Sequence, residues 1–239
     1  MTPDEARTAL ADSTAVLLGN VGRLSDDEVR TASLLPGWTR GHVLAHLAQN
    51  ADGGARLLGR ARTGEPSYEY ASLADRASDI EAESHRPAQV LIAHVNHSAA
   101  RFAEAAAQVP PDKWRATVQY TGGKEHPATV IVPSRLAEVL FHHVDLDLGF
   151  APKDWPSWFV RERLRQTSAS LTSRGVISAP VRLVATDTHF TVTLGIADET
   201  AGVVSGSECG LLAWLYGRSD GADLALDPPG RLPELPPVY

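Results

Sequence analysis

Residues 35–48 read LPGWTRGHVLAHLA, and this stretch decides how the first part of the chain folds. Its first four residues are typical of a turn, and Thr39 is a residue type that caps helix N-termini. After Thr39, small and apolar residues recur every three or four positions as far as Ala51, which is the spacing of one buried helix face. The pattern predicts a helix over 40–58, with Trp38 packed against its start.

Further apolar periodicities on either side of this stretch predict a four-helix unit with one or two long crossovers in the first 150 residues. Its helices are expected at 4–22, 40–58, 87–108 and from Ser134 to just before Gly149. The polar stretch 59–83 is expected to be irregular, with room for a short helix. Residues 116–132 are expected to be a long connection or a hairpin.

The pattern changes after a proline-containing linker at 152–156. A helical segment is expected at 157–173 and another at 208–217, with period-2, strand-like runs at 181–185 and 190–194 between them. Mixed strands and helices are typical of a small α/β or α+β domain. The chain is therefore predicted to have two domains, a helical bundle over 1–151 and a small α+β domain over 152–239.

The composition excludes several classes of protein. Of the 239 residues 43% are hydrophobic, yet no apolar run approaches the roughly 18 residues that span a bilayer. The net charge of -7 comes without a basic stripe, so we expect no nucleic-acid partner. The acidic N-terminal stretch lacks the features of a secretory signal, and the single Cys209 forbids an internal disulfide. A cytoplasmic location is expected.

Three residues on two predicted helices have the character of metal ligands. Glu138 and His142 are four apart and project from the same helix face, and His46 lies at the edge of the apolar face of its own helix. Two imidazole nitrogens and one carboxylate oxygen would leave the fourth position of Zn²⁺ open for water or substrate. Spacing alone leaves the alternative open that these histidines are hydrogen-bonded core residues.

A family resemblance covers nearly the whole chain. Residues 35–48 together with 135–146 (RLAEVLFHHVDL) resemble the mycothiol-dependent maleylpyruvate isomerase family, and the similarity continues through 203–207 (VVSGS) and 215–221 (LYGRSDG). This family belongs to the DinB-like superfamily of metal-binding four-helix bundles. The resemblance implies a DinB-like bundle followed by a small α+β domain similar to sterol-carrier folds.

The resemblance also implies the chemistry and the residues that perform it. The family's zinc ligands fall on His46, Glu138 and His142, and its functionally important second-domain arginine falls on Arg218. The implied cofactors are Zn²⁺ and the thiol mycothiol, whose thiolate adds to the cis double bond of maleylpyruvate. Bond rotation and thiol elimination then give fumarylpyruvate, in the breakdown of gentisate. Arg218 would hold the dianionic substrate from the second domain, at a site between the domains. A two-histidine, one-glutamate set also tolerates iron, nickel or manganese.

Three alternatives remain open from the sequence. The protein is a mycothiol S-transferase if the thiol stays attached to its electrophile, in detoxification or secondary metabolism. It is a non-catalytic binding protein if the second domain holds an apolar ligand and the bundle holds no metal. By position alone, Arg218 is a helix C-terminal arginine that contacts the last carbonyls. The oligomeric state is not predicted.

The remaining histidines of the bundle have simpler expected roles. His42 lies in the first turn of its helix and is expected to face solvent or the loop, while His143 is expected to be a core residue or a neighbour of the metal ligands. His94 and His97 are expected to pack inside the helix bundle. Asp145 either orients a ligand histidine or is an exposed polar residue, and the sequence does not choose between the two.

Overall fold

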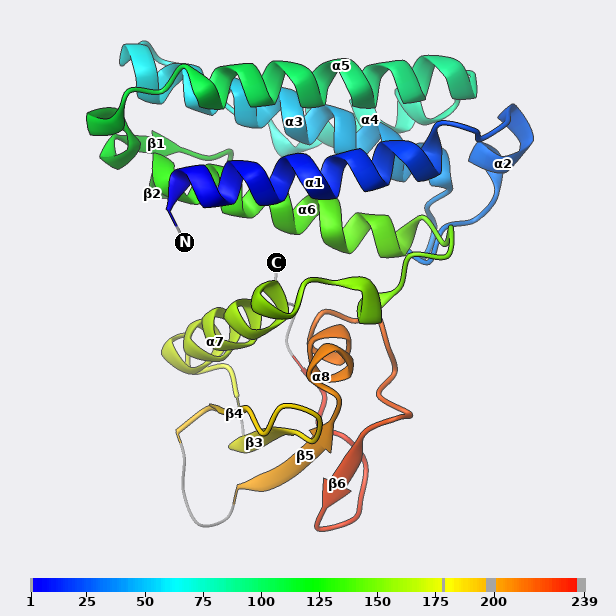
Figure 1. Cartoon of the computed structure of the whole chain (residues 1–239), viewed down its shortest axis with the longest axis vertical. Helices are drawn as coiled ribbons and strands as arrows, with labels where there is room; N and C mark the ends of the chain where they lie inside the picture. The colour runs from blue at the N-terminus through cyan, green and yellow to red at the C-terminus, as the bar shows by residue number, and fades with distance from the viewer. Residues whose placement is uncertain (1, 178, 197–200, 236–239) are drawn as a thin grey trace. The chain divides into compact units, whose positions relative to one another are not determined.

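The computed structural model describes residues 2–177, 179–196 and 201–235 and divides into two compact units, residues 1–149 and 150–239. The first unit is almost entirely helical, and the second combines helices with a four-stranded sheet (Figure 1). The predicted fold class, a helical bundle followed by a small α+β domain, is confirmed. Among the described residues no helix combines the length and the apolar character needed to cross a membrane.

The bundle consists of four long helices joined by shorter elements (Figure 1). The long helices are α1 (Pro3–Val21), α3 (Arg40–Thr63), α5 (Ala88–Ala107) and α6 (Ile131–Asp145). The shorter elements are α2 (Asp26–Arg30), α4 (Leu73–Ser84), the strands β1 (Thr117–Gln119) and β2 (Glu125–Pro127), and two short 3-10 helices, Pro111–Arg115 and Ala128–Val130.

Helix α3 is the central element of the bundle. It packs against α5 and α6, with α4 and α2 covering further parts of its surface. All eight residues from Gly41 to Ala48 are buried, so the first two turns of α3 are enclosed on every side. Polar side chains in these turns therefore have to find partners inside the protein, because water does not reach them.

The start of α3 has the capping residue that the sequence predicts, with a histidine in an unexpected role. The backbone N–H of His42 donates to Thr39 Oγ1 (3.4 Å), and the backbone N–H of Thr39 donates to His42 Nδ1 (3.2 Å). This is a capping box in which an imidazole replaces the usual Glu or Gln. Of the two expected environments of His42, solvent was wrong, because it is 7% exposed, and the loop was right, because it contacts Trp38 and Thr39. Its Nε2 lies 3.1 Å from Glu81 Oε2 on α4.

The predicted helices of the bundle are confirmed with small changes at their ends. The predicted irregular stretch 59–83 is largely helical, because α3 continues to Thr63 and the 12-residue α4 follows at Leu73. Only two residues of α4 are buried, Ile80 and Ser84, so it has almost no apolar face for periodicity to detect. Residues 117–127 form the hairpin β1–β2.

Gly41 is the position where α3 most needs a residue without a side chain. A Cβ there would lie 2.4 Å from the carbonyl oxygen of Ser84, which is backbone at the end of α4. Gly41→Ala is therefore expected to destabilise the protein by about 2–3 kcal/mol, as overpacking does when backbone must move. Denaturant unfolding measures this.

Gly59→Ala on the same helix is the matched control. Nothing lies within 4 Å of a Cβ at Gly59, so this change is expected to stabilise the protein by about 0.5–1 kcal/mol through helix propensity and a less flexible unfolded chain. If Gly41→Ala proved as harmless as Gly59→Ala, the close approach of α3 to α4 would be contradicted.

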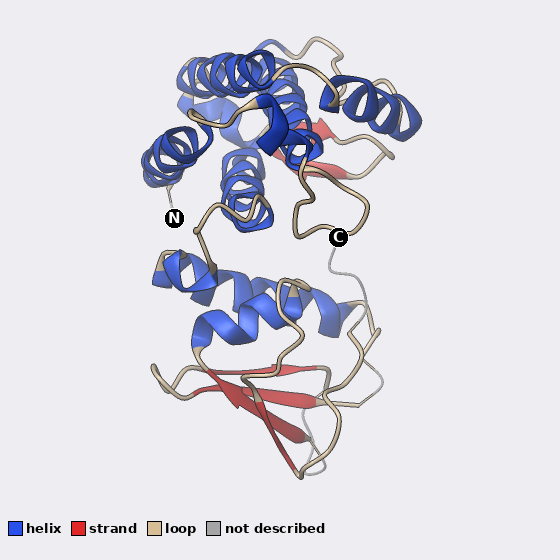
Figure 2. Cartoon of the chain, turned by 90° about the vertical axis from the view of Figure 1, so that its right-hand side faces the viewer, coloured by secondary structure: helices blue, strands red, loops and turns tan. Residues whose placement is uncertain are grey.

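The second unit is a four-stranded sheet with two helices on one face (Figure 2). After a 3-10 helix at Pro152–Asp154, its elements are α7 (Ser157–Ser173), β3 (Val181–Ala185), β4 (Thr191–Leu194), β5 (Gly202–Gly206), α8 (Glu208–Leu215) and β6 (Ala225–Asp227). The strand order is β4-β3-β5-β6, in which β3 and β5 are parallel and the two outer pairs are antiparallel. Val181, Leu183 and Ala185 of β3 are buried, while Arg182 between them is exposed.

The elements β3, β4, α7 and α8 of this unit were predicted from sequence, whereas β5 and β6 were not. Strand β5 begins and ends with glycine, and β6 has three residues. Neither segment has the alternating apolar pattern of an isolated strand, and both depend on pairing with residues distant in sequence. These two strands could therefore be identified only from their hydrogen-bonded neighbours in the folded sheet.

Candidate metal centre

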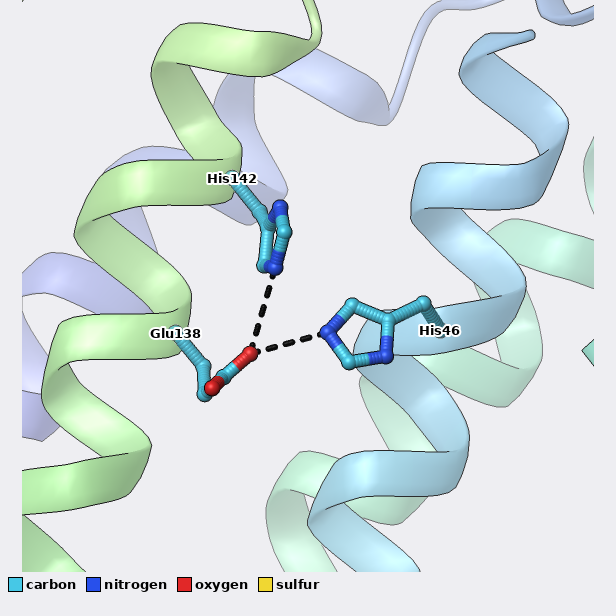
Figure 3. A group of neighbouring side chains, drawn as sticks. All are labelled: His46, Glu138 and His142. Carbon is cyan, nitrogen blue, oxygen red and sulfur yellow. Dashed lines mark hydrogen bonds and ion pairs between the residues drawn. The ribbon is translucent and has the colours of Figure 1, made fainter. Parts of the chain in front are cut away.

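The structure brings together the three predicted metal ligands. His46 extends from α3, and Glu138 and His142 extend from successive turns of α6 (Figure 3). His46 Nε2 lies 2.8 Å from Glu138 Oε2, and His142 Nε2 lies 3.2 Å from the same oxygen. One atom from each residue falls within a group no wider than 4.8 Å. These atoms converge on one point, as ligands of a single ion do.

Local helix geometry explains this convergence. Residues four apart on a helix stack one turn above the other, so Glu138 and His142 present their polar ends to the same neighbour. That neighbour is the buried start of α3, which packs directly against α6. The rings of His46 and His142 meet edge to face, with centroids 4.5 Å apart and planes at 81°.

The electrostatics of the cluster favour a carboxylate beside a neutral imidazole. Burial alone would raise the pKa of Glu138, but hydrogen bonds with His142 and His46 outweigh it and hold that pKa well below its usual range. The pKa of His46 is lowered to about 4, chiefly by burial and in part by the nearby positive charge of His142. At neutral pH Glu138 is therefore ionised and His46 is neutral, which are the forms that bind metal.

Asp145 is the outer partner of His142. The sequence left its role open, and the structure shows Asp145 only 1% exposed, with His142 Nδ1 2.8 Å from its Oδ2. A carboxylate that accepts the Nδ1 proton directs the Nε2 lone pair toward the metal position, which is the usual support for a metal-binding histidine. Burial lowers the pKa of His142, but the bonds with Asp145 and Glu138 raise it to a larger extent.

The donor set fits a divalent cation on its own chemistry. With its proton on Nδ1, His142 directs an acceptor nitrogen at an acceptor oxygen of Glu138, 3.2 Å away. Two acceptors at that separation need a proton or a cation between them. Two nitrogens and one carboxylate oxygen match the three protein ligands of a catalytic zinc site.

Arg76 is a neighbour of this centre that sequence reasoning missed. It extends from α4, and its Nη2 lies 2.8 Å from His46 Nδ1, while its guanidinium carbon lies 5.5 Å from the centre of the Tyr70 ring. Arg76 belongs to the polar stretch that was expected to be irregular with room for a short helix, and no sequence signal placed it near α3. Trp38 also lies here, with its ring 5.8 Å from that of His46 and stacked on His42 at 6.0 Å.

Two other histidines differ in how well they match expectation. His143 is 1% exposed and accepts a hydrogen bond from Asn20 Nδ2 (2.8 Å), so the prediction of a core residue is confirmed. His97 is exposed on α5, and the prediction that it packs inside the bundle was wrong. The reason is that α5 buries only the face formed by Leu91, Val95 and Phe102.

His94 forms an ion-paired cluster on the side of the bundle, which the sequence did not predict. Its Nε2 lies 3.0 Å from Asp52 Oδ2, and its Nδ1 bonds to Glu83. Hydrogen bonds to these two carboxylates raise the pKa of His94 to about 9. A raised pKa means that the folded protein holds the proton more tightly than the unfolded chain does, and so gains stability from it.

His94→Gln is expected to lower the free energy of unfolding by about 1–2 kcal/mol near pH 6, after allowance for solvent screening of a partly exposed cluster. The effect is fully present below the unfolded pKa of about 6.5 and disappears as the pH rises through about 9. Denaturant unfolding of both proteins at pH 6 and pH 10 measures this. The exposed His97→Gln is the control, and an equal loss from His94→Gln at both pH values would contradict the charged cluster.

Arg218 belongs to the second unit and follows the C-terminus of α8. Its backbone N–H donates to Ala213 O (2.8 Å), and Gly217 before it has the left-handed φ of 68° that closes this type of helix end. The side chain donates from Nη1 to Tyr216 O (2.7 Å), which is the helix-end contact that position alone suggests. Arg218 also lines a cavity of about 930 Å³ in this unit, between residues 217–222 and 229–235.

Comparisons with known proteins agree with this fold. A family model described as the mycothiol maleylpyruvate isomerase N-terminal domain matches residues 10–147, more than half of the chain. Two solved structures of a mycothiol-dependent maleylpyruvate isomerase, one of them a histidine-to-alanine variant, superpose with a TM-score of 0.90. Their sequences are 27% identical to this chain for the variant and 28% for the other structure. Each alignment covers 99% of this chain and 97% of the solved chain. No curated protein sequence gives a significant match.

Proposed function

The chain belongs to the mycothiol maleylpyruvate isomerase family, and on that premise we propose that it converts maleylpyruvate into fumarylpyruvate with bound zinc and mycothiol. The observation that carries the proposal is the convergence of His46 on α3 with Glu138 and His142 on α6, whose ligand atoms all lie within 4.8 Å of one another. We further propose that the reaction serves gentisate breakdown in the cytoplasm, as the family resemblance implies.

The three converging residues would hold the ion. When bound, a divalent ion lowers the pKa of a thiol so that the thiolate is present at neutral pH, where a free thiol of pKa about 8.5 is mostly protonated. Bound mycothiol would supply a thiolate nucleophile for reversible addition to the cis double bond, which would allow rotation about the carbon–carbon bond before the sulfur leaves. The thiolate would leave in the form in which it entered, so atoms and electrons balance without an oxidant or a reductant.

The chain's own side chains prepare the centre before any substrate arrives. Asp145 keeps the proton of His142 on Nδ1, so that Nε2 is available as a ligand. Glu138 stays ionised because two imidazoles hydrogen-bond to its carboxylate, and its charge offsets part of the charge of a divalent cation. Burial of His46 excludes water from one side of the site, which strengthens electrostatic interactions there.

We propose that Arg218 binds a carboxylate of the substrate. Its guanidinium can form two parallel hydrogen bonds to a carboxylate, which fixes both position and direction. The matching LYGRSDG motif at 215–221 and the cavity that Arg218 lines support this role.

The direct test is an assay of the zinc-loaded chain with maleylpyruvate, with and without mycothiol. Chromatography with mass detection would follow fumarylpyruvate and any thiol adduct. We expect fumarylpyruvate to form only when mycothiol is present, with the thiol recovered unchanged. Equal rates without the thiol would refute the proposed chemistry, and a stable thiol conjugate as the product would favour an S-transferase.

A further inference from the structure

The two histidines of the metal centre have opposite partners on their outer nitrogens. His142 Nδ1 faces the carboxylate of Asp145, which accepts a proton, whereas His46 Nδ1 faces the guanidinium of Arg76 at 2.8 Å, which can only donate. His46 must therefore accept at Nδ1 and carry its proton on Nε2, where it donates to Glu138 at 2.8 Å.

This arrangement at His46 is incompatible with metal ligation. A metal bound through Nε2 displaces the proton from that nitrogen, and a neutral imidazole then carries its proton on Nδ1. Nδ1–H and the N–H groups of Arg76 are both donors and cannot bond to each other. The bond between Arg76 and His46 and the bond between His46 and a metal therefore exclude one another.

Tyr70 lies beside Arg76, whose guanidinium carbon is 5.5 Å from the centre of the Tyr70 ring. The hydroxyl oxygen of Tyr70 is buried, and the charge and hydrogen bonding of Arg76 offset part of the rise in its pKa that burial causes. Because Arg76 can only donate, the phenol keeps its own O–H for a further polar group. Burial raises the pKa of Tyr70, as does the charge of Glu69, so the phenol remains a donor at neutral pH.

We propose that Arg76 is a binding residue for a carboxylate of the substrate, released from His46 when the metal binds and paired in this task with the hydroxyl of Tyr70. In the metal-free protein, Arg76 is held by His46. In the loaded protein, the guanidinium and the phenol offer donors to one anionic group beside the metal centre. The identity of the ligand as a dicarboxylate rests on the proposed function. The exchange of partners at His46 does not rest on it.

The first test measures metal affinity, which does not depend on activity. Arg76→Ala removes a bond and a positive charge that both oppose ligation of His46, so zinc is expected to bind about tenfold more tightly in a competition titration with a chromophoric chelator. Arg76→Gln is expected to change affinity in the same direction, because its amide oxygen can accept from Nδ1–H. Unchanged or weaker zinc binding in both variants would overturn the exchange at His46.

Two matched variants separate this effect from general changes of charge and packing. Arg101→Ala removes the same charge from an exposed pair with Asp52 on the bundle and is expected to leave zinc affinity unchanged. Asp145→Asn removes the proton acceptor of His142 and is expected to weaken zinc binding by about 10- to 100-fold, opposite in sign to Arg76→Ala.

The second test measures carboxylate binding with fumarate by calorimetry, with and without zinc. Arg76→Ala is expected to weaken fumarate binding about tenfold in the zinc-loaded protein and to have no effect in the metal-free protein, where His46 already holds Arg76. An equal effect in both forms, or none in either, would overturn the carboxylate role. Loss of isomerisation with these binding results intact would refute the proposed function alone.

Discussion

Glu138→Gln is expected to abolish stoichiometric metal binding and, with it, turnover. The substitution keeps the size of the side chain but removes the only negative charge among the three converging ligands. Changes to outer partners of metal ligands cost about 10- to 100-fold in affinity, and loss of a charged ligand is expected to exceed the upper end of that range. Elemental analysis of gently purified protein and a zinc titration measure the effect.

A glutamate outside the centre provides the control for this variant. Glu104 is exposed on α5, so Glu104→Gln removes the same charge and is expected to leave one equivalent of metal and full activity. Should Glu138→Gln retain a full equivalent of tightly bound zinc, then His46, Glu138 and His142 do not form the metal site. Absence of metal from the unaltered chain would instead favour a binding protein in which the bundle is only a scaffold.

Arg218→Ala is expected to keep the metal and lose turnover, by about 10²- to 10³-fold in kcat/KM. This is the usual cost of removing one preorganised donor from developing negative charge. The fold is expected to survive, because the backbone bonds that close α8 at Ala213 and Gly217 do not involve the side chain. Metal content, unfolding and steady-state kinetics of the same preparation separate the three effects.

Two further variants make the Arg218 prediction specific. Arg218→Lys keeps the charge but not the paired donors, so it is expected to recover only part of the lost activity. Arg182 is exposed on β3 of the same unit, and Arg182→Ala is expected to have no effect. If Arg218→Ala kept full activity, the proposed role in substrate binding would be contradicted. The side chain would then only stabilise the end of α8 through its bond to Tyr216 O.

Elements of the fold could be predicted from sequence where the interactions that stabilise them join residues close together in the chain. Helices α3 and α6 were predicted because an apolar residue every three or four positions acts within one or two turns, as does the capping threonine of α3. Helix α6 has no side-chain cap and begins at Ile131, before the predicted start at Ser134. Helix α4 could not be placed within 59–83 because it buries only Ile80 and Ser84, and β5 and β6 were missed because pairing with distant residues defines them.

Within the site, helix periodicity placed Glu138 and His142 on one helix face and His46 at the edge of the apolar face of its own helix, and the family resemblance points to the same three residues. The outer partners Asp145 and Arg76 could be identified only in the folded chain. Asp145 had two plausible environments, and Arg76 comes from a helix with no detectable apolar face. The physical reason is that helix periodicity reaches about one turn, whereas the hydrogen bond that Arg76 donates joins residues thirty positions apart once α4 packs on α3.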